Sequence, residues 1–164
     1  MDSRLKSIIW NQFGAAIDAL ENAMAACPDD LWRDRTRQPE FWYVAYHALF
    51  WLDFYLSASV EDFAPPAPFG LEELDPAGKL PDRLYTKDEL RAYLRFGRRK
   101  CKDTIDSLTD EKAGRPFNFG RVKLSFAELL LYNMRHVQHH AGQLNLALRQ
   151  ATDSAPGWVF GAED

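Results

Sequence analysis

The sequence has few cysteines and no pattern that would pair them. Two cysteines stand among its 164 residues, Cys27 and Cys101, far apart and outside any Cys-x-x-Cys motif. A chain with so little cysteine has no disulfide framework and suits a reducing compartment. We therefore expect a cytoplasmic protein whose stability comes from its core.

Long uninterrupted apolar runs are also absent. A membrane-spanning helix needs roughly 18 or more apolar residues in succession, and even the most apolar segment, 41–56, is broken by His47 and Asp53. Residues 1–10 carry charges and no apolar stretch of the kind found in a signal peptide. Both absences predict a soluble protein without a membrane partner.

Positive charge is neither abundant nor clustered. The formal net charge is -4, and lysine and arginine are scattered along the chain, which removes the electrostatic basis of non-specific DNA or RNA binding. Apolar residues make up 46% and charged residues 27% of the chain, as is usual for globular proteins. The length predicts one domain over residues 1–164.

Apolar residues at three- and four-residue spacing predict long helices. We expect helices over about 2–26, 39–58, 86–108 and 125–151. Pro39 suits the first turn of the second helix, because that turn leaves its backbone N–H groups unpaired. Thr86 with Glu89, and Ser125 with Glu128, have the spacing of capping boxes. These pairs predict where the last two helices begin.

Two connections are rich in turn-forming residues. The segment from Ser59 to Tyr85 contains many prolines and glycines, which favour neither a long helix nor a strand. We expect a long crossover loop after the second helix, and the sequence leaves open whether it is a lid or a passive connection. Residues 109–123 are also turn-rich, with a short hairpin at 117–124 as an alternative. The predicted fold class is all-α, a four-helix bundle.

All four histidines lie in two of the predicted helices. His47 is in the second, and His136, His139 and His140 are in the fourth. Neutral imidazole is the commonest protein ligand for transition metals, and two histidines on adjacent helical turns can bind one ion. The spacing permits His136 to pair with either His139 or His140.

A helical wheel distinguishes these pairs. At about 100° per residue, His140 points toward the apolar stripe of the fourth helix, His136 lies at its edge, and His139 points outward. His47 falls on an aromatic face of the second helix, where an unpaired imidazole would be costly. We predict that His47, His136 and His140 bind one divalent metal ion. The alternative is that they are core histidines satisfied by hydrogen bonds.

Three histidine ligands leave a coordination position open, as in catalytic rather than structural zinc sites. Gln143 lies one turn after His140, and Tyr43 one turn before His47, so either could contact a ligand or the open position. Trp51 could form an aromatic wall for a substrate. A di-iron carboxylate site is disfavoured, because no histidine of the fourth helix has an acidic residue three positions before it.

These residues resemble a known family. His47 in an aromatic second helix and the segment HVQHHAGQ at 136–143 resemble the DinB-like (YfiT-type) metalloenzyme superfamily, and the resemblance extends over nearly the whole chain. It implies a four-helix bundle with a crossover connection, and one zinc or nickel ion held by His47, His136 and His140. It also implies that homodimers are frequent, and that some relatives use low-molecular-weight thiols.

Three functions follow from this resemblance and the residues. The first is a metal-dependent S-transferase that joins a small-molecule thiol to an electrophilic substrate. The second is a metal-dependent hydrolase, which would use water as its nucleophile and require a general base that the sequence does not identify. The third is a non-catalytic, dimeric metal- or ligand-binding module. The apolar residues Leu131 and Leu146 fall outside the core stripe of the fourth helix and would suit a homodimer contact.

Overall fold

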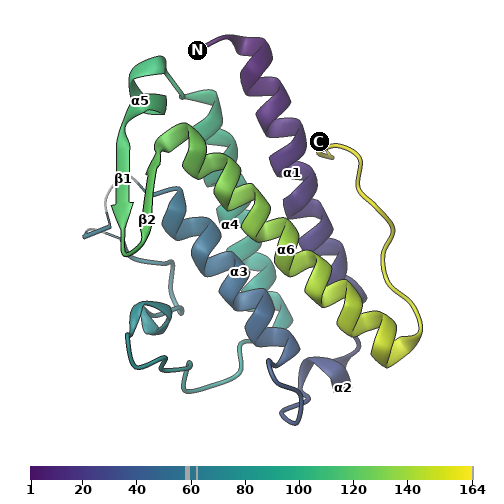
Figure 1. Ribbon diagram of the computed structural model, residues 1–164. Helices are drawn as coiled ribbons and strands as arrows, with labels where there is room; N and C mark the ends of the chain where they lie inside the picture. Colours follow the sequence, from purple (N-terminus) through teal and green to yellow (C-terminus); the bar gives the residue numbers. More distant parts are fainter. Residues whose placement is uncertain (58–59, 62, 164) are drawn as a thin grey trace.

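Four long helices form a bundle in the computed structural model, which describes residues 1–57, 60–61 and 63–163 (Figure 1). They are α1 (Ser3–Ala26), α3 (Phe41–Tyr55), α4 (Lys87–Asp106) and α6 (Phe126–Thr152). Helix α6 packs against α1 and α3, and α4 packs against the same two helices. The predicted all-α fold class is therefore confirmed.

Shorter elements occupy the connections. They are α2 (Asp29–Trp32), the 3-10 helix η1 (Glu72–Leu74), α5 (Asp110–Gly114), β1 (Pro116–Phe119) and β2 (Val122–Ser125). The two strands form an antiparallel hairpin in which Phe119 pairs with Val122. Its turn contains Gly120 at a φ of 54°, a conformation that glycine adopts without strain. The alternative of a short hairpin at 117–124 is thus confirmed.

Two capping boxes begin the last long helices, as predicted. The Thr86 hydroxyl accepts a hydrogen bond from the Glu89 N–H, and the Glu89 carboxylate accepts one from the Thr86 N–H. Ser125 and Glu128 repeat this arrangement at the start of α6. Each box satisfies N–H groups that the first helical turn leaves without an intrahelical partner.

The second long helix is shorter than predicted. Pro39 precedes it, and Glu40 is its N-cap residue in an extended conformation. The Glu40 carboxylate accepts from the Trp42 indole N–H at 2.6 Å and pairs with Arg35 at 2.8 Å, so side-chain contacts hold this residue outside the helix. The helix ends at Tyr55. The predicted end at Ala58 and the predicted start of the loop at Ser59 lie outside the described residues.

The crossover segment, here residues 60–61 and 63–85, follows α3 and is anchored in the core. Phe63 meets Phe50 and Phe54 edge-on, with ring centroids 5.3 and 5.1 Å apart. Phe69 stacks on Tyr93 of α4 at 4.4 Å. Burying an aromatic side chain contributes roughly 1.5–3 kcal/mol, so these contacts hold the crossover segment against the bundle.

The outer surface of the bundle keeps some apolar residues. Leu131 and Leu146 of α6 are 48% and 57% exposed, as the helical wheel predicts, and the homodimer stays a prediction.

None of the helices in the described ranges combines the length and apolar character needed to cross a bilayer. After α6 the chain runs back beside α1, where the Ala162 N–H donates to the Asn11 carbonyl at 2.9 Å (Figure 1).

Candidate metal centre

Helices α3 and α6 bring three histidines together. His136 Nε2 lies 3.4 Å from His47 Nε2 and 3.0 Å from His140 Nε2. All three side chains are half-buried, whereas His139 is exposed. The structure thus selects the spacing of four over the spacing of three, because His140 rather than His139 joins His136 and His47. These three residues could hold a metal ion.

Hydrogen bonds on the side facing away from the cluster determine which ring nitrogen of His47 and of His140 carries the proton. His47 Nδ1 lies 2.6 Å from Glu73 Oε2, and His140 Nδ1 lies 2.7 Å from Gln143 Oε1. Carboxylate and amide oxygens accept hydrogen bonds, so each Nδ1 carries the proton and donates it. In the neutral rings, Nε2 of both histidines is left with a free lone pair directed at the centre of the cluster.

Burial keeps two of the three imidazoles neutral. Desolvation, with smaller repulsion from neighbouring histidines, lowers the pKa of His136 to about 3. The same causes lower the pKa of His140 to about 4, although its hydrogen bond to Gln143 opposes them. Both rings are therefore neutral at pH 7, which is the form that binds a metal.

The donor set fits a divalent cation. If His136 donates from Nε2 to one neighbour, the other neighbour's lone pair has no donor within the cluster. A cation at the centre would instead accept all three Nε2 lone pairs. Nitrogens at ~2.0–2.1 Å from a tetrahedral zinc lie roughly 3.3 Å apart, close to the observed 3.0 and 3.4 Å.

Glu73 is a site residue that the sequence did not reveal. It lies in η1, within the crossover segment, and its side chain is only 5% exposed. Besides His47, its carboxylate accepts from the Trp51 indole N–H at 2.9 Å and from the Tyr43 hydroxyl. Burial alone would raise the pKa of Glu73, but these hydrogen bonds outweigh it and hold the pKa below its ordinary value. No sequence signal distinguished Glu73 from Glu72, because the contact joins positions 26 residues apart.

Comparison with known proteins places this chain in a family. A family model of the DinB superfamily matches residues 12–144. The chain belongs to the DinB superfamily. The matched range includes His47, His136 and His140, together with Glu73 and Gln143. Neither the comparison with curated proteins nor that with solved structures gave a match.

The other candidate residues of this DinB-superfamily chain surround the histidines. The rings of Tyr43 and Trp51 both lie 6.2 Å from the ring of His47, one on each side along α3. Burial and the hydrogen bond to Glu73 raise the pKa of Tyr43, so its hydroxyl stays protonated. Gln143 is exposed and bonded to His140. Substrate contact by Tyr43, Trp51 or Gln143 stays a prediction.

Two tyrosines adjoin the cluster and were not identified from the sequence. Tyr55 lies two turns after His47, and Tyr132 one turn before His136. Their rings meet edge-on at 5.4 Å, and the Tyr55 ring lies 6.2 Å from that of His136. Burial and a hydrogen bond to Tyr132 raise the pKa of Tyr55. The helical wheel that selected the histidines could have found both.

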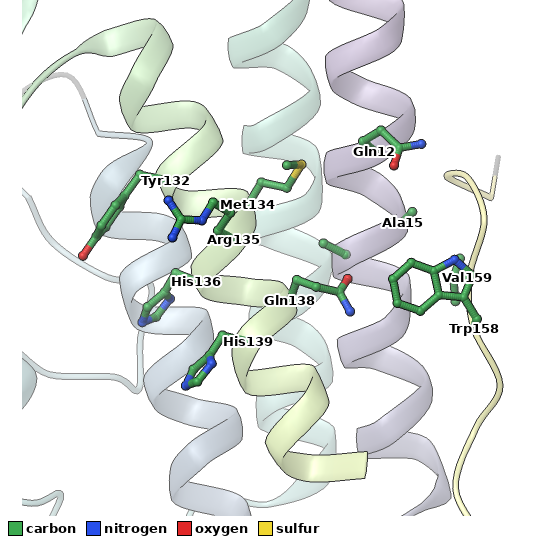
Figure 2. Close-up of a pocket in the computed structure, with 11 residues that line it drawn as sticks. Gln12, Ala15, Tyr132, Met134, Arg135, His136, Gln138, His139, Trp158 and Val159 are labelled. Atoms are coloured by element: carbon green, nitrogen blue, oxygen red, sulfur yellow. The ribbon is translucent and has the colours of Figure 1, made fainter. Parts of the chain in front are cut away.

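A groove of about 560 Å³ shares His136, but neither of the other two histidines, with the cluster. Figure 2 shows Tyr132, Arg135, His136 and His139 on the side of α6 toward α3, and Gln138 pointing toward α1 and Trp158 of the C-terminal segment. His47 and His140 do not line the groove. The three histidines, rather than this groove, therefore define the candidate site.

Proposed function

We propose that this DinB-superfamily protein binds one divalent metal ion, zinc or nickel, through His47, His136 and His140. We further propose that it is an S-transferase acting on a low-molecular-weight thiol and an electrophile. The observation that carries the proposal is the convergence of three Nε2 atoms with contacts of 3.0 and 3.4 Å. Three protein ligands leave a position free for a further ligand.

Each part of the site has a task in this proposal. When bound, the metal ion supplies Lewis acidity that lowers the pKa of a thiol and favours the thiolate. Glu73 and Gln143 orient His47 and His140 through Nδ1. The burial that keeps His136 and His140 neutral makes their lone pairs available at pH 7.

The nucleophilic sulfur comes from outside the chain. Cys27 and Cys101 are buried, at 2% and 0% exposure. Burial raises the pKa of the Cys27 thiol to about 12 and raises that of Cys101 as well. Both therefore remain thiols at neutral pH and are poor nucleophiles. This supports a small-molecule thiol as the partner of the metal site.

Aromatic rings beside the histidines could hold the electrophile. Trp51 is half-buried, and its ring lies 5.3 Å from that of Tyr55 and 6.0 Å from that of Phe119 in the hairpin. Such rings offer apolar area with little loss of side-chain entropy. The electrophile would rest against this wall while the thiol occupies the free position.

Hydrolysis is less well supported, because it needs a base near the attacking water. Glu73 contacts the cluster on the Nδ1 side of His47 and already accepts from Trp51 and Tyr43. It is therefore not placed to take a proton on the Nε2 side, where the three histidines converge.

Elemental analysis of the purified protein tests the metal site. We expect close to one equivalent of metal in the wild type and in the matched control His139→Ala, whose side chain is exposed. His136→Ala and His140→Ala should retain little. A wild type that contains no metal and binds no added zinc, nickel or manganese would refute the proposal.

Cobalt substitution tests the reaction class. Cysteine or glutathione should change the visible spectrum of the cobalt-loaded protein, and a model electrophile such as 1-chloro-2,4-dinitrobenzene should be consumed only when thiol is present. Turnover of a model ester without thiol would favour the hydrolase. An unchanged spectrum without turnover would favour a non-catalytic binding module.

A further inference from the structure

Glu73 links the crossover segment to the histidine cluster through a buried charge. Its side chain is 5% exposed and accepts from three different side chains of α3: His47 at 2.6 Å, Trp51 at 2.9 Å and Tyr43. A carboxylate accepting several hydrogen bonds in a buried position has one well-defined orientation. Through this contact the ring of His47 is oriented as well.

The three histidines have unequal partners. His47 donates to an anionic carboxylate, His140 donates to the neutral amide of the exposed Gln143, and His136 Nδ1 has no partner among the described residues. A carboxylate partner fixes the ring and raises the basicity of the opposite nitrogen more than an amide does. His47 is therefore the ligand most dependent on its partner.

Besides Glu73, the segment around η1 meets the bundle through apolar contacts, since Leu74 packs against the core and Pro81 is buried. Phe69 and Tyr85 anchor its two ends in the core, and residues 75–80 between them are exposed. The local hydrogen bonds are short-range turns, from the Leu74 N–H to the Leu71 carbonyl and from the Asp75 N–H to the Glu72 carbonyl. Such turns do not bind the segment to α3, whereas the Glu73 carboxylate does.

We infer that Glu73 is a positioning residue that couples the crossover segment to metal binding. It holds the Nδ1–H tautomer of His47 with Nε2 toward His136, and it places a negative charge near the ion. Because linkage is reciprocal, metal binding stabilises η1 to the same extent that the Glu73 contact stabilises the bound metal. The inference rests on the proposed metal site and adds a role for the crossover segment, which is neither a free lid nor a passive connection.

Metal affinity tests this role. Zinc binding is measured by competition with a chromophoric chelator for the wild type, Glu73→Gln and Glu72→Gln. The last is a matched control, because it removes the same charge from the neighbouring position in η1. Loss of an outer partner of a ligating histidine typically weakens affinity by about 10–100-fold. We expect a loss of this size in Glu73→Gln and a change below about twofold in Glu72→Gln.

Two further measurements separate positioning from a merely structural role. Nitrogen NMR of the metal-free wild type should show the His47 ring with its proton on Nδ1, and Glu73→Gln should shift the ring toward a mixture of tautomers. Zinc should slow hydrogen exchange at the Leu74 and Asp75 amides in the wild type and have less effect in Glu73→Gln.

The outcomes distinguish this inference from the proposed function. If the wild type and Glu73→Gln bind zinc equally well, the coupling is refuted while the metal site stands. Equal losses in Glu73→Gln and Glu72→Gln would indicate a general charge effect and would also refute positioning by Glu73. If the wild type binds no metal, both proposals fail.

Discussion

Helix α3 contributes to two buried polar clusters of opposite character. In the first, Asp53 is 1% exposed and meets the Lys100 ammonium, the Tyr93 hydroxyl at 3.0 Å and, through Lys100, the Ser57 hydroxyl. Each acceptor has a donor, and the two charges cancel. Such a network is complete without any ligand.

The second cluster is incomplete by the same criterion. His47, His136 and His140 face one another with nitrogens that are mainly acceptors, while the donors of His47 and His140 are used on the opposite side. Burial of polar groups therefore does not by itself mark a site. What distinguishes the histidine cluster is an excess of lone pairs directed at one point.

The largest effect on stability is expected at the cluster of Asp53 and Lys100. Asp53→Ala removes the carboxylate that meets Lys100 and Tyr93, while the Lys100 ammonium, 27% exposed, keeps the backbone carbonyl of position 53 and the Ser57 hydroxyl. Loss of hydrogen bonds to a charged group costs about 1.5–3 kcal/mol. Urea unfolding should show a loss of this order. The control Asp82→Ala, at a side chain 89% exposed, should change the free energy of unfolding by less than about 0.5 kcal/mol. A small effect of Asp53→Ala would show that the ion pair contributes little.

The histidine cluster should make the stability of the metal-free protein depend on pH. In the folded state the pKa of His136 is about 3 and that of His140 about 4, whereas an unfolded histidine has a pKa of about 6.5. The unfolded chain therefore binds more protons between these values. The free energy of unfolding should fall as pH drops from 7 to 5, by up to about 1.4 kcal/mol per pH unit for each histidine.

Urea midpoints at several pH values measure this slope. The double variant His136→Leu/His140→Leu should lose much of it, whereas His139→Gln, at an exposed position, should retain it. An unchanged slope in the double variant would contradict the assignment of neutral, buried imidazoles.

The smallest expected effect lies away from both clusters. Ser125→Ala removes the hydroxyl that accepts from the Glu128 N–H at the start of α6, and loss of such a cap costs about 1 kcal/mol. Metal content should not change, because the cap lies about three turns before His136. The control Ser7→Ala, within α1, should have a smaller effect. Loss of metal in Ser125→Ala would show that the site depends on the global stability of α6.

Much of the fold could be predicted because its signals are local. The repeat of apolar residues and the capping boxes at Thr86 and Ser125 depend on neighbours within one or two turns. The start of the second helix was misplaced at Pro39, since the side-chain contacts of Glu40 with Trp42 and Arg35 override the preference of proline for the first turn. Contacts of that kind do not appear in a periodicity pattern.

The residues of the candidate site were predictable where local helical geometry places them, and not where a long-range contact does. His136 and His140 are four residues apart on one helix, so helical geometry alone places them together. Their meeting with His47 was inferred from the faces of two helices, and the structure brings the three nitrogens into contact. Glu73 could not be inferred, because a 3-10 turn inside a proline-rich segment has no period that would orient its side chain.

The four long helices and the face on which each histidine lies follow from the amino-acid sequence, because they depend on the regular geometry of one helix. Which buried polar groups have a partner of opposite charge or a matching donor depends on the tertiary structure. Asp53 and Glu73 are both buried acids, but one meets a lysine and the other a histidine. Lys100 of α4 meets Asp53 of α3, whereas Glu73 of η1 meets His47 of α3. The packing of α4 and η1 against α3 therefore determines which donor each carboxylate meets.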